Sequence, residues 1–335
     1  MIKPEILQRA VTQGLLNPEQ EAPLLDFINR QQDADLPSAQ DEEQLKFVRN
    51  FGDIFITIGV AFVAISIATM DLQNWQWWLS AGCFVALAEW LVRQRRLALP
   101  GMAILLSIMY FVAQGAGLPD IDLFADQYSS IPSLLLLAGC AGAFYWRYGM
   151  PFSLLPMTLS IVTIALIGLG EELLQHQWLF TLTGLVVFAV AMTFDSKDRH
   201  RQLRWSDCGF WLHLLASPLI VHGVMTTLIF SDASVLNALG NEILLISFFI
   251  VFMLIALLVD RRAMLVSSSS YGIYAIFMLL ENSPVSAENL PLVVFIGFGL
   301  FIIVFGTFWY RLRSVIFRPL ASTAVAKLVP ELNGK

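Results

Sequence analysis

The feature that most constrains this chain is a series of apolar runs, each about twenty residues long, between residues 51 and 310. A run of that length matches a helix across about 30 Å of hydrocarbon, whereas a membrane β-strand would alternate apolar and polar residues. Only 14% of the residues are charged and the mean hydropathy is +0.69, against about 25% charged residues in soluble domains. The sequence therefore predicts an all-α integral membrane protein, whose helices satisfy their own backbone polar groups.

The pattern of runs predicts about ten transmembrane helices. They cover residues 51–70, 76–92, 98–117, 131–146, 151–170, 178–194, 207–230, 241–259, 263–280 and 290–310. All 20 Lys and Arg residues fall before the first run, after the last run or in alternate loops. Because basic residues are retained on the cytoplasmic side of a membrane, this pattern predicts that both termini are cytoplasmic. The remaining loops, which would face outward, carry acidic residues and neither Lys nor Arg.

Tryptophan positions and the polar N-terminus agree with a multi-pass protein of the bacterial inner (cytoplasmic) membrane. Trp75 and Trp178 mark predicted outer helix ends, while Trp90, Trp146 and Trp309 lie near predicted inner ends, and indole rings prefer the headgroup level. The first fifty residues are polar and of mixed charge, so no cleavable signal is expected. The first span would serve as its own insertion signal.

Three parts are predicted along the chain. Residues 1–46 form a short cytoplasmic helical hairpin followed by an acidic linker, with Gly14 ending the first helix and Asn17 capping the second. Residues 47–312 form the transmembrane bundle, and residues 313–335 a cytoplasmic tail. Because the hairpin is too small for a stable core of its own, it is expected to dock on another surface, such as that of another membrane or envelope protein.

The hairpin also carries a resemblance to a known family. Residues 13–20 read QGLLNPEQ, which is similar to the GLITPEQ opening of a bacterial membrane family named domain of unknown function 2157. The Asn74-Trp75 pair after the first span resembles the NW that follows the first span there. The resemblance covers roughly residues 5–95 and implies a cytoplasmic hairpin followed by many spans. It implies no activity and no catalytic residues.

Four polar residues inside predicted spans are candidates for an intramembrane site, since such residues are costly in hydrocarbon. Glu89 lies one turn from Arg93, so an i,i+4 ion pair would explain it without a site. His213 and His222 lie on opposite faces of one helix, about 13 Å apart along its axis. His213 is predicted at the depth of Glu89, so the two could pair, or each histidine could pack with local hydrogen bonds. Ser217 precedes a proline, which predicts a kink.

A second candidate is an acidic outer loop that contains Asp120, Asp122 and Asp126. Clustered carboxylates suit calcium, but no complete calcium-binding loop is present, so a solvated loop is expected and no metal is predicted. The three cysteines do not have metal-ligand spacing, and they are expected to be small side chains within the membrane: Cys83, Cys140 and Cys208. No cofactor is predicted, because nucleotide-binding glycine loops and hydrolase motifs are absent from the sequence.

These observations leave three classes of function. A transporter-like carrier of a small or amphipathic molecule is slightly favoured, because ten spans with short loops suit a compact transporter. The alternative is a non-catalytic scaffold, sensor or assembly partner that acts through the N-terminal hairpin. An intramembrane enzyme ranks third, since only Glu89 and His213 could supply chemistry at one depth. The dispersed basic residues and a calculated pI of 5.2 do not indicate nucleic-acid binding. The expected partner common to all three classes is the lipid bilayer.

Overall fold

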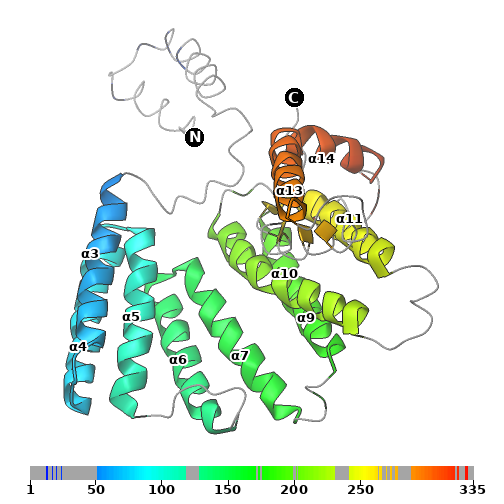
Figure 1. Ribbon diagram of the computed structural model, residues 1–335. Helices are drawn as coiled ribbons and strands as arrows, with labels where there is room; N and C mark the ends of the chain where they lie inside the picture. Colours follow the sequence, from blue (N-terminus) through cyan, green and yellow to red (C-terminus); the bar gives the residue numbers. More distant parts are fainter. Residues whose placement is uncertain are drawn as a thin grey trace. The chain divides into compact units, whose positions relative to one another are not determined.

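A computed structural model describes residues 51–117, 128–170, 176–198, 203–230, 241–262 and 288–320, with isolated positions outside these ranges (Figure 1). Regular structure within the described residues is helical, and none of them lies in a strand. The predicted helical class is therefore confirmed for this part of the chain.

The helices follow one another as α3 (Phe51–Ala68), α4 (Asn74–Ala88), the π-helix η1 (Glu89–Gln94), α5 (Ala98–Ala116), the 3-10 turn η2 (Tyr128–Ser130), α6 (Ile131–Tyr148), the 3-10 turn η3 (Pro151–Ser153), α7 (Leu154–Gly168), α9 (Trp178–Lys197), α10 (Arg204–Phe230), α11 (Asn241–Val259), α13 (Leu290–Thr307), α14 (Trp309–Phe317) and the 3-10 turn η4 (Arg318–Leu320). Among the described residues, seven helical segments are long and apolar enough to cross a membrane. They are Phe51–Ala68, Ala98–Ala116, Tyr128–Tyr148, Pro151–Gly168, Trp178–Lys197, Arg204–Thr227 and Leu290–Thr307.

The remaining predicted spans fall outside these seven for different reasons. The span predicted over residues 76–92 corresponds to α4 continued by η1, so its α-helical part is only 15 residues long. In α11 the described apolar part, Ile246–Val259, is also shorter than a full span. The span predicted over residues 263–280 lies largely outside the described residues. The number ten therefore stays a prediction.

The C-terminal boundary differs from the prediction in one respect. The span predicted over residues 290–310 is interrupted at Phe308, whose backbone (φ −96°, ψ 11°) leaves the helical region between α13 and α14. The tail predicted to begin at residue 313 therefore starts within a helix. One face of α14 is buried through Trp309, Arg313 and Phe317, which lie four residues apart and so share a face.

The chain divides into two compact units, one of Met1–Gln44 with Asn333–Lys335 and one of Leu45–Leu332. Most of the predicted hairpin at residues 1–46 lies outside the described residues. At Asn17 the backbone N–H donates to Oε1 of Gln20 over 3.3 Å, and Gln20 donates its own N–H to the carbonyl of Asn17 over 2.9 Å. This local arrangement agrees with the helix start predicted at Asn17.

Among the helices α3 to α6, α5 is central, because α3, α4 and α6 all pack against it (Figure 1). Ile104, Leu105 and Phe111 of α5 are fully buried. The indole N–H of Trp78 on α4 donates to the carbonyl of Gly115 over 2.9 Å, where α4 approaches α5 closely. Apolar packing around α5 thus organises this half of the larger unit.

Further along the chain, α9 and α10 pack together along much of their length. Glycine permits this approach, since a Cβ on Gly184 would lie 2.7 Å from the backbone nitrogen of Ile220. In the most apolar stretch of α10, 67% of the residues are buried, whereas in α3 only 11% of the residues are buried. α10 also contacts α7 and α11. It therefore connects helices that precede it in the chain with helices that follow it.

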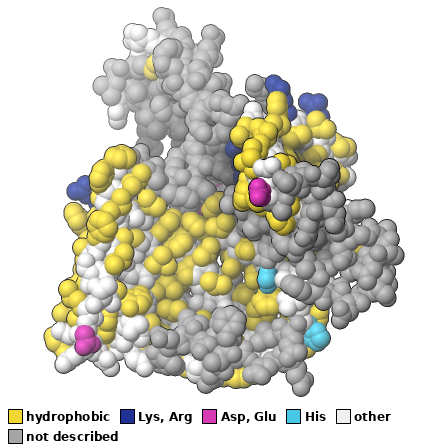
Figure 2. All heavy atoms as spheres, viewed as in Figure 1, with side chains coloured by type: hydrophobic (Ala, Val, Ile, Leu, Met, Phe, Trp, Pro, Cys, Tyr) yellow, Lys and Arg dark blue, Asp and Glu magenta, His cyan; other side chains and the backbone are white. Residues whose placement is uncertain are grey.

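Large apolar side chains cover the outside of the described helices. Figure 2 shows hydrophobic side chains over much of the visible described surface, while the Lys and Arg side chains seen there lie in the upper half of the view. On α3, Phe55, Phe62 and Ile65 are each at least 60% exposed. A soluble domain rarely exposes a continuous apolar surface of this kind, whereas lipid tails cover it at no cost.

Candidate functional site

Three clusters of paired charges are formed by described residues alone, each at helix ends that the sequence predicts to be cytoplasmic. We name them after their carboxylates: the Asp195 cluster (Asp195, Ser206, His213 and Arg261), the Asp260 cluster (Arg201, Asp260, Trp309 and Arg313) and the Glu89 cluster (Glu89, Arg93, Arg147 and Tyr148).

The Asp195 cluster is almost completely shielded from solvent. Asp195, near the end of α9, is 1% exposed, and its Oδ2 lies 2.9 Å from Nε2 of His213 on α10. The guanidinium of Arg261 bonds both carboxylate oxygens, with Nε 3.4 Å from Oδ2. Arg261 also donates to the carbonyl and the hydroxyl of Ser206, over 2.9 and 3.1 Å. One carboxylate therefore ties α9 to α10 and to the segment after α11.

The Asp260 cluster is organised by Asp260, the residue directly before Arg261 in the sequence. Asp260 accepts the indole N–H of Trp309 over 2.6 Å, and its carboxylate lies 3.3 Å from Nη1 of Arg201 and 3.8 Å from Nε of Arg313. Arg313 also donates to the carbonyl of Pro330 over 2.6 Å. These contacts join the α9–α10 loop to α14 and to a residue near the C-terminus.

The end of α11 explains why neighbouring residues serve two clusters. The helix ends at Val259, and Asp260 adopts a left-handed backbone conformation (φ 57°), which aspartate tolerates better than most residues. The N–H of Arg261 then bonds back to the carbonyl of Ala256 over 3.0 Å. This turn directs Asp260 and Arg261 toward different partners.

The loop between α9 and α10 is shaped by a further carboxylate. Oδ2 of Asp198 accepts the backbone N–H groups of Leu203 and Ser206 over 2.8 and 3.3 Å. These donors lie at the start of α10, and a carboxylate there caps the helix and matches its dipole. The cap holds Ser206 where its carbonyl and hydroxyl meet Arg261.

The Glu89 cluster is far more open. Oε2 of Glu89 lies 3.1 Å from Nη1 of Arg93, one turn further along η1, and Oε1 lies 2.8 Å from Nη2 of Arg147 at the end of α6. The hydroxyl of Tyr148 donates to Oε1 over 3.2 Å. Glu89, Arg93 and Arg147 are 33%, 58% and 40% exposed. The i,i+4 pair proposed from the sequence is present, with a second arginine added.

The structure does not form the pair of Glu89 with His213 that the sequence allowed. Each group has other partners, since His213 meets Asp195 and Glu89 meets two arginines. The physical reason is that α9 lies directly against α10 and brings a carboxylate of its own to His213.

The other two residues of the predicted intramembrane site lie apart from this pair. Ser217 is fully buried, and its hydroxyl donates to the carbonyl of Met264 over 3.0 Å. His222 is exposed and meets the ring of Phe180 edge-on, with the centroids 5.6 Å apart. The opposite placement of His213 and His222 agrees with the prediction from helix geometry. The four predicted residues therefore do not converge on one site.

The acidic loop predicted from the sequence is not part of the described structure. Asp120, Asp122 and Asp126 lie outside the described residues. Within the part of the chain that the structure describes, no group of three His, Cys, Asp or Glu residues could hold a metal ion.

Sequence reasoning missed Asp195, Asp260 and Arg261, the residues that organise the buried clusters. All three sit at the ends of apolar runs, where a charged residue is usually solvated. One signal could have found them: Asp195 and Asp260 each end a long apolar run directly before a basic segment. A carboxylate at that depth needs a cationic partner, and the basic loops supply one.

Charge balance indicates what the Asp195 cluster can do. The charges of Asp195 and Arg261 compensate one another, and Nε2 of His213 lies within hydrogen-bond distance of the same carboxylate. A carboxylate in this position orients an imidazole, as in hydrolase triads. However, Nδ1 of His213 has no hydrogen-bond partner among the described residues, so no nucleophile there is in contact with it. The contacts of the Asp195 cluster connect α9, α10 and the segment after α11.

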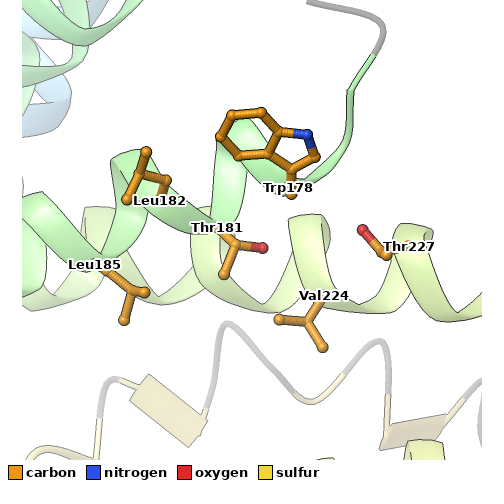
Figure 3. Close-up of a pocket in the computed structure, with 6 residues that line it drawn as sticks. All are labelled: Trp178, Thr181, Leu182, Leu185, Val224 and Thr227. Atoms are coloured by element: carbon orange, nitrogen blue, oxygen red, sulfur yellow. The ribbon is translucent and has the colours of Figure 1, made fainter.

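Two cavities among the described helices are lined by apolar surface. The first, which we call the α9–α10 groove, has a volume of about 320 Å³ and is lined by Trp178, Thr181, Leu182, Leu185, Val224 and Thr227 (Figure 3). The second has a volume of about 200 Å³ and is lined by Ile246, Phe249, Gly272, Ile276, Phe298 and Phe301. The described residues that line the two cavities include no charged side chain.

Comparison with known proteins gives no relative from which a role could be transferred. No family model, no curated protein and no solved structure matches this chain.

Proposed function

We propose that this protein is a polytopic protein of the bacterial inner membrane with ten spans and both termini in the cytoplasm. The Asp195 and Asp260 clusters support this threading. They bring together the α9–α10 loop, the segment after α11 and α14, which the distribution of Lys and Arg assigns to one side of the membrane. Loops on opposite sides of about 30 Å of hydrocarbon could not make such contacts.

Within that architecture we propose a carrier for an amphipathic, lipid-like molecule. The observation that carries this proposal is the α9–α10 groove, whose lining is apolar and whose rim opens outward at Trp178, Leu182 and Leu185, each about half exposed. Figure 3 shows its residues arranged along two adjacent helices. A groove of this kind accepts an apolar chain directly from the bilayer, whereas a soluble polar substrate would meet only two threonine hydroxyls among the described lining residues.

The polar end of such a molecule would meet the outer helix ends. Trp178 begins α9 and Thr227 lies near the end of α10, at the side where the sequence has acidic residues and no Lys or Arg. An amphipathic molecule with a neutral or cationic polar group fits this environment better than an anionic one.

Transport can be tested in vesicles that contain the purified protein. A fluorescent amphipathic molecule should cross between leaflets faster than in protein-free vesicles, and Val224→Trp, which fills the groove, should slow it. The matched control is Val190→Trp, because Val190 is 45% exposed on α9 but does not line the groove. Equal rates with and without the protein would contradict the carrier.

A non-catalytic membrane partner is the second candidate. It is favoured by the way the buried charges are used, because Asp195, Arg261 and Asp260 are held by one another and by neighbouring groups rather than directed into a cavity. Such contacts stiffen a bundle that presents its surface to another protein. Cross-linking in native membranes would test this role through a reproducible neighbour attached to residues 1–46, with no effect of Val224→Trp.

A further inference from the structure

Two arginines from separate helices share one carboxylate in the Glu89 cluster. Arg93 belongs to the π-helix η1 and Arg147 to the last turn of α6, and Glu89 lies within 3.1 Å of the first and 2.8 Å of the second. The π-helical turn widens the helix at the point where Glu89 begins it, and such turns are frequent at functional sites. The carboxylate therefore fixes the spacing of two guanidinium groups.

Both guanidinium groups keep most of their hydrogen-bonding capacity. A guanidinium has five N–H donors, and the carboxylate engages a single nitrogen of each in this cluster. Arg93 and Arg147 are 58% and 40% exposed. Because two positive charges face one negative charge, the cluster stays cationic, and the exposed Arg95 in the next turn adds to its field. In the buried Asp195 cluster, by contrast, one arginine matches one carboxylate.

Aromatic side chains place the cluster at the level of lipid headgroups. Trp90 and Trp146, the neighbours in sequence of Glu89 and Arg147, are 49% and 87% exposed. Exposed tryptophans in a membrane protein gather at the headgroup region. The guanidinium of Arg95 also lies over the ring of Trp90, 5.6 Å from its centroid. A site at this level meets the phosphate groups of the bilayer before any soluble ligand.

We propose that the Glu89 cluster is a binding site for the phosphate of an anionic phospholipid. Arg93 and Arg147 donate to the phosphate oxygens, for which the planar guanidinium is well suited. Glu89 is a positioning residue that holds the two arginines and does not touch the lipid. The negative charge of the cytoplasmic leaflet supplies ligands at this face.

The test compares lipid binding to the purified full-length protein by native mass spectrometry. Phosphatidylglycerol is expected to be retained about tenfold more tightly than phosphatidylcholine. Both lipids carry a phosphodiester, but the ammonium group of choline cancels the negative charge of phosphatidylcholine and is repelled by the cationic cluster. Arg93→Gln combined with Arg147→Gln should bring the two lipids close to parity. Arg93→Lys with Arg147→Lys keeps the charge but removes the planar fork, so an intermediate preference is expected.

The matched control removes two exposed arginines from another helix end. Arg311→Gln combined with Arg318→Gln should leave the preference unchanged. If this control abolishes the preference as fully as the changes at Arg93 and Arg147, only general surface charge attracts the lipid and the site is refuted. Displacement of phosphatidylglycerol by millimolar inorganic phosphate would assign the site to free phosphate and overturn the lipid as its ligand.

Discussion

The Asp195 and Glu89 clusters both pair a carboxylate with arginine, but the first is buried and the second is partly exposed. In each, one carboxylate receives arginine from a distant part of the chain, but Asp195 is 1% exposed and Glu89 is 33% exposed. In the buried cluster each group has lost its water and depends on its partners. In the open cluster water and lipid can replace a lost partner. Burial thus decides which charges hold the helices together and which stay available for a ligand.

The largest effect is expected when one partner of the buried cluster is removed. Arg261→Met leaves Asp195 without its cation in a site closed to water, which should cost about 3–5 kcal/mol of stability. The loss of stability is measured by thermal unfolding in detergent, monitored as the fraction of the protein that remains monodisperse.

The neighbouring residue supplies the control for this experiment. Arg262 stacks on the rings of Trp309 and Tyr310, 5.5 and 5.1 Å from their centroids, so Arg262→Met should cost only about 0.5–1 kcal/mol. The double change of Arg261→Met with Asp195→Leu should cost less than Arg261→Met alone, since no uncompensated charge remains. Equal losses of stability for Arg261→Met and Arg262→Met would show that the buried pair contributes no more to stability than the ring contacts of Arg262.

A smaller effect is expected from His213, which contributes one hydrogen bond while Arg261 still balances the charge of Asp195. His213→Leu should cost about 1–3 kcal/mol, the range for a buried acceptor that loses a partner. His222→Leu on the exposed side of the same helix is the comparison, and it should leave the melting temperature almost unchanged. A larger loss for His222→Leu than for His213→Leu would reverse the roles assigned to the two histidines.

The smallest effect on stability is expected in the open cluster. Glu89→Gln leaves Arg93 and Arg147 in contact with solvent, so the melting temperature should shift much less than with Arg261→Met. The same thermal unfolding assay measures both variants. A shift as large as that of Arg261→Met would mean that Glu89 is a structural brace, and the contrast between the clusters would fail.

The sequence predicts the helical class and the approximate bounds of most described helices, because apolar runs and turn residues act locally. It also predicts the contact of Glu89 with Arg93, which depends only on helix spacing. The contact of Glu89 with Arg147 requires two helices to meet, and that of Asp195 with Arg261 joins residues 66 positions apart. Such contacts depend on packing, on which a single sequence carries no direct signal. The break at Phe308 was missed because apolar residues continue through it.

The central claim is that all three clusters lie at the cytoplasmic ends of the spans. Single cysteines at the exposed positions of Arg95, Lys197 and Arg311 test it against one at Asp71, with the native residues Cys83, Cys140 and Cys208 replaced by alanine. In intact bacterial cells a membrane-impermeant maleimide should label only the cysteine at position 71, and the other three should react after permeabilisation. Labelling of position 197 in intact cells would contradict the threading and the assignment of the clusters to the cytoplasmic side.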